Sequence, residues 1–283
     1  MLLELAIGDA YGAGFEYANE RVERFNDLSG YVKHPRHSGT KPGMYTDDTQ
    51  MTLAITELIV SGAEWTSLNL ASKFVEVFKR DPREGYAGSF HSFLTRVEDG
   101  QQFLAEIKPD SEKSGAAMRA TPIGIYPTIA EVVEKCTIQA AVTHNTELGI
   151  AAACASALTA HYFIYDLGDK KDLGDFLDTH VGKHPYGWAG EYQGKVKSKG
   201  WMSVWAAVTA LRRNSSLSDL LKDCVAFKGD VDTVATIALG AASHSREYTS
   251  DLPQILINIL ENRTYGRDYL LELDQKLVAL IKR

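Results

Sequence analysis

Along most of the chain, apolar residues recur at the spacing of one face of an α-helix. Such faces follow Thr49, Thr66 and Trp201, and another occupies the C-terminal stretch. Their apolar positions are Leu53, Ile55, Leu58 and Ile59; Leu68, Leu70, Phe74, Val75 and Phe78; Val204, Val208 and Leu211; and Leu270, Leu273, Leu277 and Leu280. The alternating pattern of strands is sparse, and no Asn-Gly or Asp-Gly pair separates two alternating segments. The pattern therefore predicts an all-α fold of about a dozen helices.

Residues that cap helix N-termini stand at several of the expected helix starts. Thr66 precedes the second apolar face, and Thr128 with Glu131 has the spacing of a capping box. Asp251 and Pro253 indicate another start, with the proline inside the first turn.

Loops rich in Gly and Pro are expected at 30–43, 81–88, 108–115 and 184–200. None of them has the length and polarity of an interdomain linker, so we expect residues 1–283 to form one domain.

The most apolar run extends from Leu148 to Tyr165 and is rich in alanine. Polar Ser156, Thr159 and His161 interrupt it, which favours a buried helix over a membrane span. The first residues of the chain lack the basic region that begins a signal peptide. We therefore expect a soluble, cytoplasmic protein that does not insert into a membrane.

Composition and charge narrow the classes of protein further. The chain has 283 residues, of which 45% are hydrophobic and 24% charged, and this composition excludes wholesale disorder. The net charge of −7, with no Lys/Arg block to offset it, argues against binding to duplex nucleic acid. The three cysteines, Cys136, Cys154 and Cys224, form no close pair, which argues against disulfides and a cysteine zinc site. We expect a reducing compartment and a monomer.

Two short acidic segments stand apart from the helix-building pattern. They are Tyr45-Thr46-Asp47-Asp48-Thr49 and Gly229-Asp230-Val231-Asp232-Thr233, and each precedes a long apolar helix. One explanation is structural, because Asp and Thr cap helix N-termini. However, capping needs a single acceptor, and a second adjacent Asp adds repulsion unless a cation offsets it.

An oxygen-lined metal site is the functional explanation of these segments. Carboxylate and hydroxyl oxygens without His or Cys suit Mg²⁺ or Mn²⁺ rather than zinc. Four carboxylates are sufficient for two divalent ions about 3.5–4 Å apart. Upstream, Glu16 follows a segment with Gly8, Gly12 and Gly14, where glycines allow close approach of another element or a ligand. Helix packing explains these glycines equally well, and Glu16 is placed to reach a metal-bound water or a reacting group.

In their order along the chain, these segments resemble the signatures of the ADP-ribosylglycohydrolase family. The matching segments are Gly8-Asp9-Ala10-Tyr11-Gly12, Thr46-Asp47-Asp48-Thr49 and Gly229-Asp230-Val231-Asp232-Thr233. In addition, Ser114-Gly115-Ala116-Ala117-Met118-Arg119 resembles the family's Gly-Asn-Gly-x-x-Met-Arg loop, and Thr143-His144 resembles its Thr-His segment. The resemblance runs from residue 5 to about 245 and so covers most of the chain. The family includes the enzyme that removes ADP-ribose from dinitrogenase reductase and animal ADP-ribosyl-arginine and ADP-ribosyl-serine hydrolases.

The resemblance implies a compact, orthogonal multi-helix domain with a central binuclear Mg²⁺ site, in which Mn²⁺ is a possible substitute. The metal ligands that it implies are Thr46, Asp47, Asp48, Asp230, Asp232 and Thr233. Glu16 would lie beside the metals and the scissile ribose, and Glu16, Asp47 and Asp232 are the expected catalytic residues. The expected substrate-binding residues are Ser114, Gly115, Ala116, Ala117, Met118, Arg119, His144, Gly85 and Tyr86.

The resemblance implies a hydrolase that cleaves the glycosidic bond between ADP-ribose and an acceptor. Nearby carboxylates stabilise the oxocarbenium-like transition state of such a cleavage. The general acid or base is left open between Glu16 and a metal-bound Asp, and the acceptor among arginine, serine, nucleic-acid ends and small esters. Two alternatives are a non-catalytic ADP-ribose or nucleotide binder and a structural protein of the same fold. The presence of all six ligand-type residues together with Glu16 favours the hydrolase.

The chain departs from the family pattern at two loops. Ser114 stands where Asn is common, and the loop 80–88 carries Gly85-Tyr86-Ala87-Gly88 instead of an Asp-containing pattern. Asp81 and Glu84 are the possible replacements for the acid that some members contribute from this loop. Arginine-linked specificity is therefore not implied.

Several other polar and aromatic residues have a structural explanation beside a functional one. Arg119 fits phosphate binding or structural pairing, and His34 with His37 would need a third ligand to hold a metal. The aromatic rings that fit either stacking on the ligand or the core are Tyr86, Tyr126 and Trp188, whereas Trp201 and Trp205 are expected in the core. The small-residue loop around Trp188 is a candidate lid.

Overall fold

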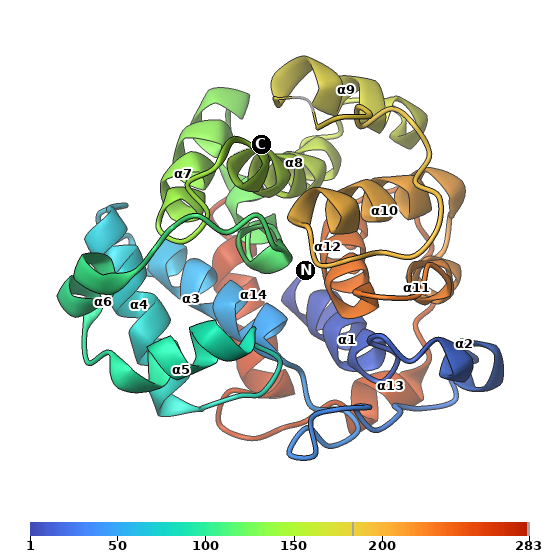
Figure 1. The fold of residues 1–283 in the computed structure, drawn as a ribbon. Helices are drawn as coiled ribbons and strands as arrows, with labels where there is room; N and C mark the ends of the chain where they lie inside the picture. The colour runs from blue at the N-terminus through green and yellow to red at the C-terminus, as the bar shows by residue number, and fades with distance from the viewer. Residues whose placement is uncertain (183, 282–283) are drawn as a thin grey trace.

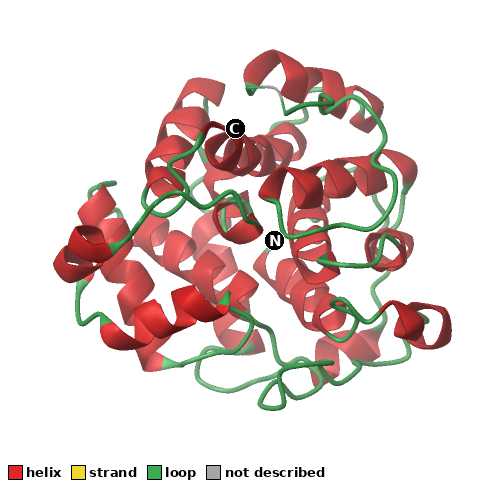
Figure 2. Ribbon diagram, in the orientation of Figure 1, coloured by secondary structure: helices red, strands yellow, loops and turns green. Residues whose placement is uncertain are grey.

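The computed structural model of the chain describes residues 1–182 and 184–281. Within these residues every regular element is a helix, as Figure 2 shows, and the only β-type pairings are isolated bridges. The predicted all-α fold is therefore confirmed.

The described residues contain fourteen α-helices and three short 3₁₀ helices, joined by loops. The first seven α-helices are α1 (Leu2–Ala13), α2 (Asn19–Phe25), α3 (Asp47–Ser61), α4 (Ser67–Arg80), α5 (Gly88–Arg96), α6 (Gly100–Glu106) and α7 (Ile129–Ala141). The others are α8 (Glu147–Ile164), α9 (Leu173–His180), α10 (Gly200–Arg213), α11 (Leu217–Ala226), α12 (Val231–Ala242), α13 (Gln254–Ile259) and α14 (Arg267–Val278). The 3₁₀ helices are η1 (Ser114–Ala116), η2 (Thr121–Ile125) and η3 (Lys170–Asp172).

Helices α1 and α12 form the centre of the fold, and Figure 1 shows them side by side despite their distance in the sequence. Their backbones approach closely because glycines of α1 face α12. A Cβ atom on Gly8 would lie 2.6 Å from the Ala235 carbonyl oxygen, and one on Gly12 would lie 2.4 Å from the Asp232 Cα. The packing explanation of these two glycines therefore holds, and their packing fixes where α12 begins.

The alanine-rich run forms α8, the one described helix whose length and composition would suit a membrane span. Of its 18 residues, 83% are buried inside the fold. The prediction of a buried core helix is therefore confirmed.

The expected helix starts are confirmed in part. Thr66 and Thr128 each accept a hydrogen bond from the backbone N–H three residues later, at the starts of α4 and α7. Asp251 does not cap α13, because its carboxylate accepts from the Ser218 N–H at the start of α11 instead. Leu280 was expected on the apolar face of the C-terminal helix, and this expectation was wrong. Helix α14 ends at Val278, and Leu280 lies beyond it with 44% of its surface exposed.

The close approach of α1 and α12 gives a direct test of the fold. In Gly8→Ala, the new methyl group meets backbone rather than a movable side chain, so the free energy of unfolding should fall by about 2 kcal/mol or more. In the control Gly30→Ala, a Cβ atom meets nothing within 4 Å, and stability should change little. Urea titration measures both values, and equal values for the two variants would contradict the packing.

Candidate active site and metal centre

Asp9 of α1 holds the first acidic segment in place. Its buried carboxylate accepts hydrogen bonds from the backbone N–H and the hydroxyl of both Thr46 and Thr49, at distances from 2.6 to 3.1 Å. These donors belong to the start of α3, so Asp9 supplies that helix with its N-terminal cap from another helix. The Thr46 side chain makes no cap bond of its own. Asp47 and Asp48 are therefore not needed as caps, which removes the structural explanation of this segment.

The second acidic segment lies at the start of α12, beside α1. Asp230 is the N-cap residue of α12 but makes no side-chain cap bond, and its carboxylate instead accepts from the Ser203 hydroxyl of α10 at 3.1 Å. The preceding Gly229 has φ +99°, and a Cβ atom there would collide with the Val196 carbonyl oxygen. The Asp230 N–H donates to the same carbonyl. The loop from α9 to α10 thus fixes the direction in which Asp230 enters the site.

The loop 80–88 passes the first acidic segment at Gly85. Gly85 has φ +117°, and a Cβ atom on it would lie 2.1 Å from the Asp47 Oδ1. Glycine is required here because both the backbone conformation and the contact exclude a side chain. Gly85 therefore packs directly against Asp47, and its expected contact with a substrate stays a prediction.

The tertiary structure brings the two pairs of carboxylates close enough for strong mutual repulsion. Burial raises the pKa values of Asp47, Asp48 and Asp232 well above the usual range, and neighbouring carboxylates raise them further. Burial and the nearby Glu16 raise the pKa of Asp230 to about 7. One oxygen each of Asp48 and Asp232 is buried without a hydrogen-bond partner. A cation would compensate both the repulsion and these unpaired oxygens.

The donor set fits a hard divalent cation. Carboxylate oxygens of Glu16, Asp230 and Asp232 lie within 4.8 Å of one another. Thr46 and Thr233 are buried at the starts of α3 and α12, the helices that carry Asp48 and Asp232. An all-oxygen set of this kind suits Mg²⁺ or Mn²⁺.

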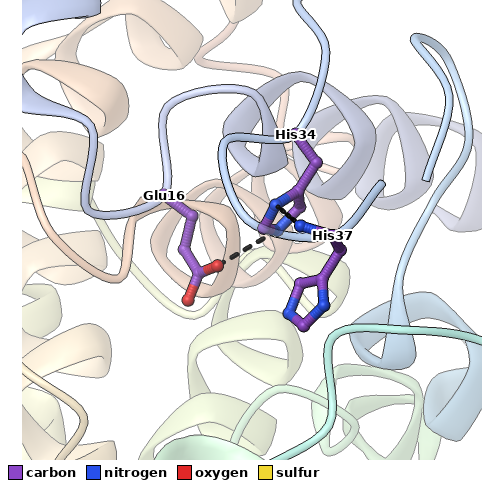
Figure 3. Close-up of side chains that lie close together, drawn as sticks. All are labelled: Glu16, His34 and His37. Atoms are coloured by element: carbon purple, nitrogen blue, oxygen red, sulfur yellow. Dashed lines mark hydrogen bonds and ion pairs between the residues drawn. The ribbon is translucent and has the colours of Figure 1, made fainter. Parts of the chain in front are cut away.

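Glu16 differs from the other acids because it has cationic partners. Its carboxylate lies 2.6 Å from the Arg36 guanidinium and 3.1 Å from the His34 Nε2. Figure 3 shows the contact of Glu16 with His34. Burial acts to raise the pKa of Glu16, but the contacts with His34 and Arg36 outweigh it, and the pKa is lowered. Glu16 is therefore the acid of the site that most readily carries a charge.

The predicted phosphate loop and His144 meet at the turn η1. A Cβ atom on Gly115 would lie 3.1 Å from the His144 ring, and the turn is closed by bonds from Ala117 and Met118 to the Ser114 carbonyl. Ala116, Ala117 and Met118 are buried, so their side chains belong to the core and this stretch can meet a ligand only through its backbone. The Ser114 side chain acts to lower the pKa of Asp230, so the turn lies beside the acidic cluster.

Arg119 takes the structural alternative that the sequence left open. Its guanidinium is buried, donates to the Gln139 side chain and carbonyl, and lies over the Phe74 ring. It also donates to the Thr143 hydroxyl at 2.9 Å. It supports the loop from within the core and does not face the site.

Arg119 and His144 meet at the Thr143 hydroxyl. The Thr143 oxygen accepts from Arg119 and lies 2.7 Å from the His144 Nδ1. The other ring nitrogen of His144, Nε2, is buried, has no hydrogen-bond partner and lies beside Gly115. Burial and the charge of Arg119 lower the pKa of His144 to about 3. His144 is thus a neutral ring beside the turn η1.

The remaining residues of the loop 80–88 are engaged within the protein. The Tyr86 ring is buried and its hydroxyl donates to the Gln50 side chain, so Tyr86 belongs to the core. Asp81 pairs with Arg83, and the Glu84 carboxylate accepts from the backbone of residues 39 and 40. Neither acid therefore replaces the missing loop Asp in this structure.

Two expectations about aromatic residues need correction. Trp188 is completely buried, and its backbone N–H donates to the Asp178 carboxylate of α9, so the loop that carries it is anchored rather than lid-like. Trp201 and Trp205 are half-buried instead of lying in the core. They pack against His184 and Tyr186, the second of which is 67% exposed.

Sequence reasoning assigned no role to Asp9, Ser203 or His34 in the site. Asp9 carried a signal, because it is an acidic residue inside an apolar helix. The contacts of Ser203 and His34 join residues that are distant in the sequence, and no local pattern could reveal them.

The whole chain, residues 1–283, matches the sequence model of the family described as ADP-ribosylglycohydrolase. It is 26% identical to the ADP-ribosylhydrolase ARH3 of Xenopus tropicalis over 87% of this chain and 86% of that protein. It is 25% identical to the ADP-ribosyl-[dinitrogen reductase] glycohydrolase of Rhodospirillum rubrum, over 99% of this chain and 91% of that protein.

A bacterial arginine-linked relative and a solved structure also match. The chain is 23% identical to the ADP-ribosylarginine hydrolase Tri1 of Pseudomonas putida, over 84% of this chain and 67% of that protein. Its fold is similar to a chain described as an ADP-ribosylglycohydrolase-related protein complex, with a TM-score of 0.74. That match has 19% identity and covers 99% of this chain and 96% of the other.

The bonds of Asp9 predict a large effect of a small substitution. Asp9→Asn keeps the side-chain shape but cannot accept from four donors, so the free energy of unfolding should fall by about 2 kcal/mol or more. Asp99 caps α6 at the surface with a single bond, and Asp99→Asn should be nearly neutral because Asn caps as well. Chemical denaturation compares the two, and a neutral Asp9→Asn would refute the role of this residue.

The raised pKa values predict how the metal-free protein responds to pH. Because the folded state holds the Asp230 proton up to a pKa of about 7, against an ordinary value of 3.8, stability should fall as pH rises through this window. Added Mg²⁺ should reverse the fall, since the cation replaces the proton. Melting temperatures with chelator and with Mg²⁺ across this pH range measure both effects. Asp230→Asn should flatten the pH dependence in chelator, and an unchanged slope would contradict this origin.

Proposed function

We propose an activity for this chain from the premise that it belongs to the ADP-ribosylglycohydrolase family. Its named relatives are ADP-ribosyl hydrolases, so the chain is a hydrolase that acts on glycosyl bonds. We propose that it cleaves, with Mg²⁺, the glycosidic bond between ADP-ribose and an acceptor. The observation that carries this proposal is the group of buried carboxylates at the two acidic segments. Glu16 lies beside Asp230 and Asp232, and one oxygen each of Asp48 and Asp232 lacks a hydrogen-bond partner.

The acidic segments would hold the metal ions. We assign two Mg²⁺, or Mn²⁺ in their place, to Thr46, Asp47, Asp48, Asp230, Asp232 and Thr233, which combine buried carboxylates with hydroxyl oxygens. When bound, the ions supply an activated water and orient the ribose hydroxyls. The raised pKa values of the Asp residues mean that cation binding must displace protons, so binding should strengthen as pH rises.

Glu16 is the residue that would handle the proton at the scissile bond. Its lowered pKa keeps the carboxylate ionised and ready to accept a proton from the attacking water. Asp47 and Asp232 would stabilise the positive charge that develops on the ribose ring. Asp47 and Asp232 are also alternatives for the proton-transfer role, because each has a raised pKa.

The other end of the substrate would lie against η1. The His144 Nε2 lies without a partner beside Gly115. Because Ala116, Ala117 and Met118 are buried, the turn would meet a ligand through its backbone. Neutral donors of this kind suit phosphate or ribose oxygens. The influence of Ser114 on the pKa of Asp230 supports a subsite beside the acidic cluster.

Release of ADP-ribose from defined conjugates tests the proposal. Arginine-, serine-, ester- and nucleic-acid-linked ADP-ribose are incubated with the protein in Mg²⁺ or in chelator. We expect release from at least one conjugate in Mg²⁺ alone. Asp47→Ala and Asp232→Ala should lower it by about 100-fold or more while the circular dichroism spectrum stays helical. Asp175→Asn, which changes an exposed carboxylate, should retain full activity.

The outcomes separate the proposal from its alternative. Silence with every conjugate, while ADP-ribose still binds in calorimetry, would overturn the hydrolase and indicate a non-catalytic ADP-ribose binder. Release that is unaffected by chelator and by both Asp substitutions would overturn the metal assignment.

A further inference from the structure

The loop between α2 and α3 contacts both carboxylate oxygens of Glu16. The Arg36 guanidinium lies 2.6 Å from the Glu16 Oε1, and the His34 Nε2 lies 3.1 Å from the Glu16 Oε2. Figure 3 shows that the His34 ring and the Glu16 carboxylate face each other. Each oxygen of Glu16 therefore has a partner of its own, one a cation and the other an imidazole.

The far end of this loop is tied to the loop 80–88. The Glu84 carboxylate accepts hydrogen bonds from the backbone N–H groups of Gly39 and Thr40, at 2.9 and 3.1 Å. Both donors lie a few residues after His34 in the sequence. Glu84 thus restrains the loop that brings His34 to Glu16.

The hydrogen bonds of the His34 ring assign its proton. The Nδ1 accepts from the backbone N–H groups of Arg36 and His37, both at 3.1 Å, so this nitrogen carries a lone pair and no proton. The ring is then neutral, and its single proton lies on Nε2, toward Glu16. No other side chain or backbone group of the described residues bonds to this Nε2. His34 therefore has no lone pair for a metal ion, and the metal site considered for His34 and His37 is not supported.

The two partners of Glu16 differ in burial. His34 is 4% exposed, whereas the Arg36 side chain is 54% exposed and lies over the half-buried Tyr17 ring. An exposed guanidinium can turn into solvent when a substrate enters, but a packed imidazole whose orientation is fixed by two backbone bonds cannot. The contact at Oε2 is therefore the lasting one, and Oε1 is the oxygen that can be released to accept a proton.

Asp230 and Asp232 oppose this placement of Glu16. Carboxylate oxygens of the three residues lie within 4.8 Å of one another, and like charges at this distance repel. Rotation of the Glu16 side chain toward solvent would relieve the repulsion. The proton of the oriented His34 ring opposes that rotation, because Glu16 is its one acceptor among the described residues.

We propose that His34 is a positioning residue for hydrolysis, which holds Glu16 through Oε2 with a neutral N–H donor and leaves Oε1 to accept the proton of the attacking water. The positive charge beside Glu16 comes from Arg36, whereas His34 supplies the direction of the carboxylate. The catalytic consequence rests on the proposed hydrolase function, in which Glu16 handles the proton. The contact between His34 and Glu16 does not depend on that function.

Two substitutions separate this role from simple support of the loop. In His34→Asn, the amide oxygen replaces the Nδ1 as acceptor for the backbone N–H groups, but no atom replaces the Nε2 donor. In His34→Gln, the longer amide places an N–H donor near the position of the Nε2, but the acceptor for the backbone is lost. The first variant keeps the loop bonds without the contact to Glu16, and the second keeps the contact without the loop bonds.

Steady-state kinetics on the conjugate that the protein hydrolyses compare the two variants. The kcat should fall by about tenfold or more in His34→Asn and by less in His34→Gln, because a misplaced proton acceptor is felt in the transition state. The KM should stay within about twofold in both, since the substrate is bound by other groups. His180→Asn, which changes an exposed histidine on α9, should keep both constants.

The opposite order of kcat would overturn the proposal, because a residue that only supports the loop is better replaced by Asn than by Gln. An unchanged kcat in His34→Asn, or a change confined to KM, would overturn it as well.

The contact itself is measured without substrate, by nitrogen NMR of the imidazole rings. The His34 signals are those that disappear in His34→Asn or His34→Gln. They should show a neutral ring with its proton on Nε2, and they should shift in Glu16→Ala. Glu20→Ala, which removes an exposed carboxylate of α2, should leave them in place.

A ring proton on Nδ1, or no shift of the His34 signals in Glu16→Ala, would overturn the proposal even if the His34 variants were too unstable for kinetics. A confirmed contact in a protein that releases no ADP-ribose from any conjugate would support the contact and overturn the hydrolase. Normal release by His34→Asn would overturn the role of His34 and leave the hydrolase standing.

Discussion

The arrangement of the site depends on the carboxylate of Asp9. It is buried inside α1 and accepts from both donors of Thr46 and both donors of Thr49, and so it fixes the start of α3. The same helix packs on α12 through Gly8 and Gly12, with no room for a side chain between the backbones. A single helix thus sets the positions of two acidic segments that are far apart in the sequence. The hydrogen bonds of Asp9 and the absence of side chains at Gly8 and Gly12 bring the two acidic segments together.

This arrangement places like charges close together in a buried site, and that unfavourable electrostatics indicates a functional role. Burial and mutual repulsion raise the pKa values of the four Asp carboxylates, whereas His34 and Arg36 lower that of Glu16. Carboxylates with opposed shifts in one site commonly have different roles, and here the separation is between binding a cation and moving a proton. Glu16 lies beside both the acidic cluster and the pair of His34 and His37.

Local patterns predicted most of the helices, because helix periodicity and caps such as Thr66 and Thr128 act over a few residues. They failed where a side chain finds a distant partner. Asp251 has the residue type of a cap for α13 but bonds to α11, and Arg119 has the look of a phosphate ligand but is held by Gln139. In each case the residue type suits two partners, and only the packing of helices selects one of them.

The sequence by itself determined the helical class, the family and the six ligand-type residues, because each is carried by a short segment whose residue types are chemically specific. The tertiary structure decided which of these residues face one another. It gave Asp9 the capping role, placed His144 between Thr143 and the turn η1, and brought His34 and His37 to Glu16. The physical reason is the range of the interactions: periodicity and capping are local, whereas burial, repulsion between carboxylates and hydrogen bonds between helices exist only after the chain has folded.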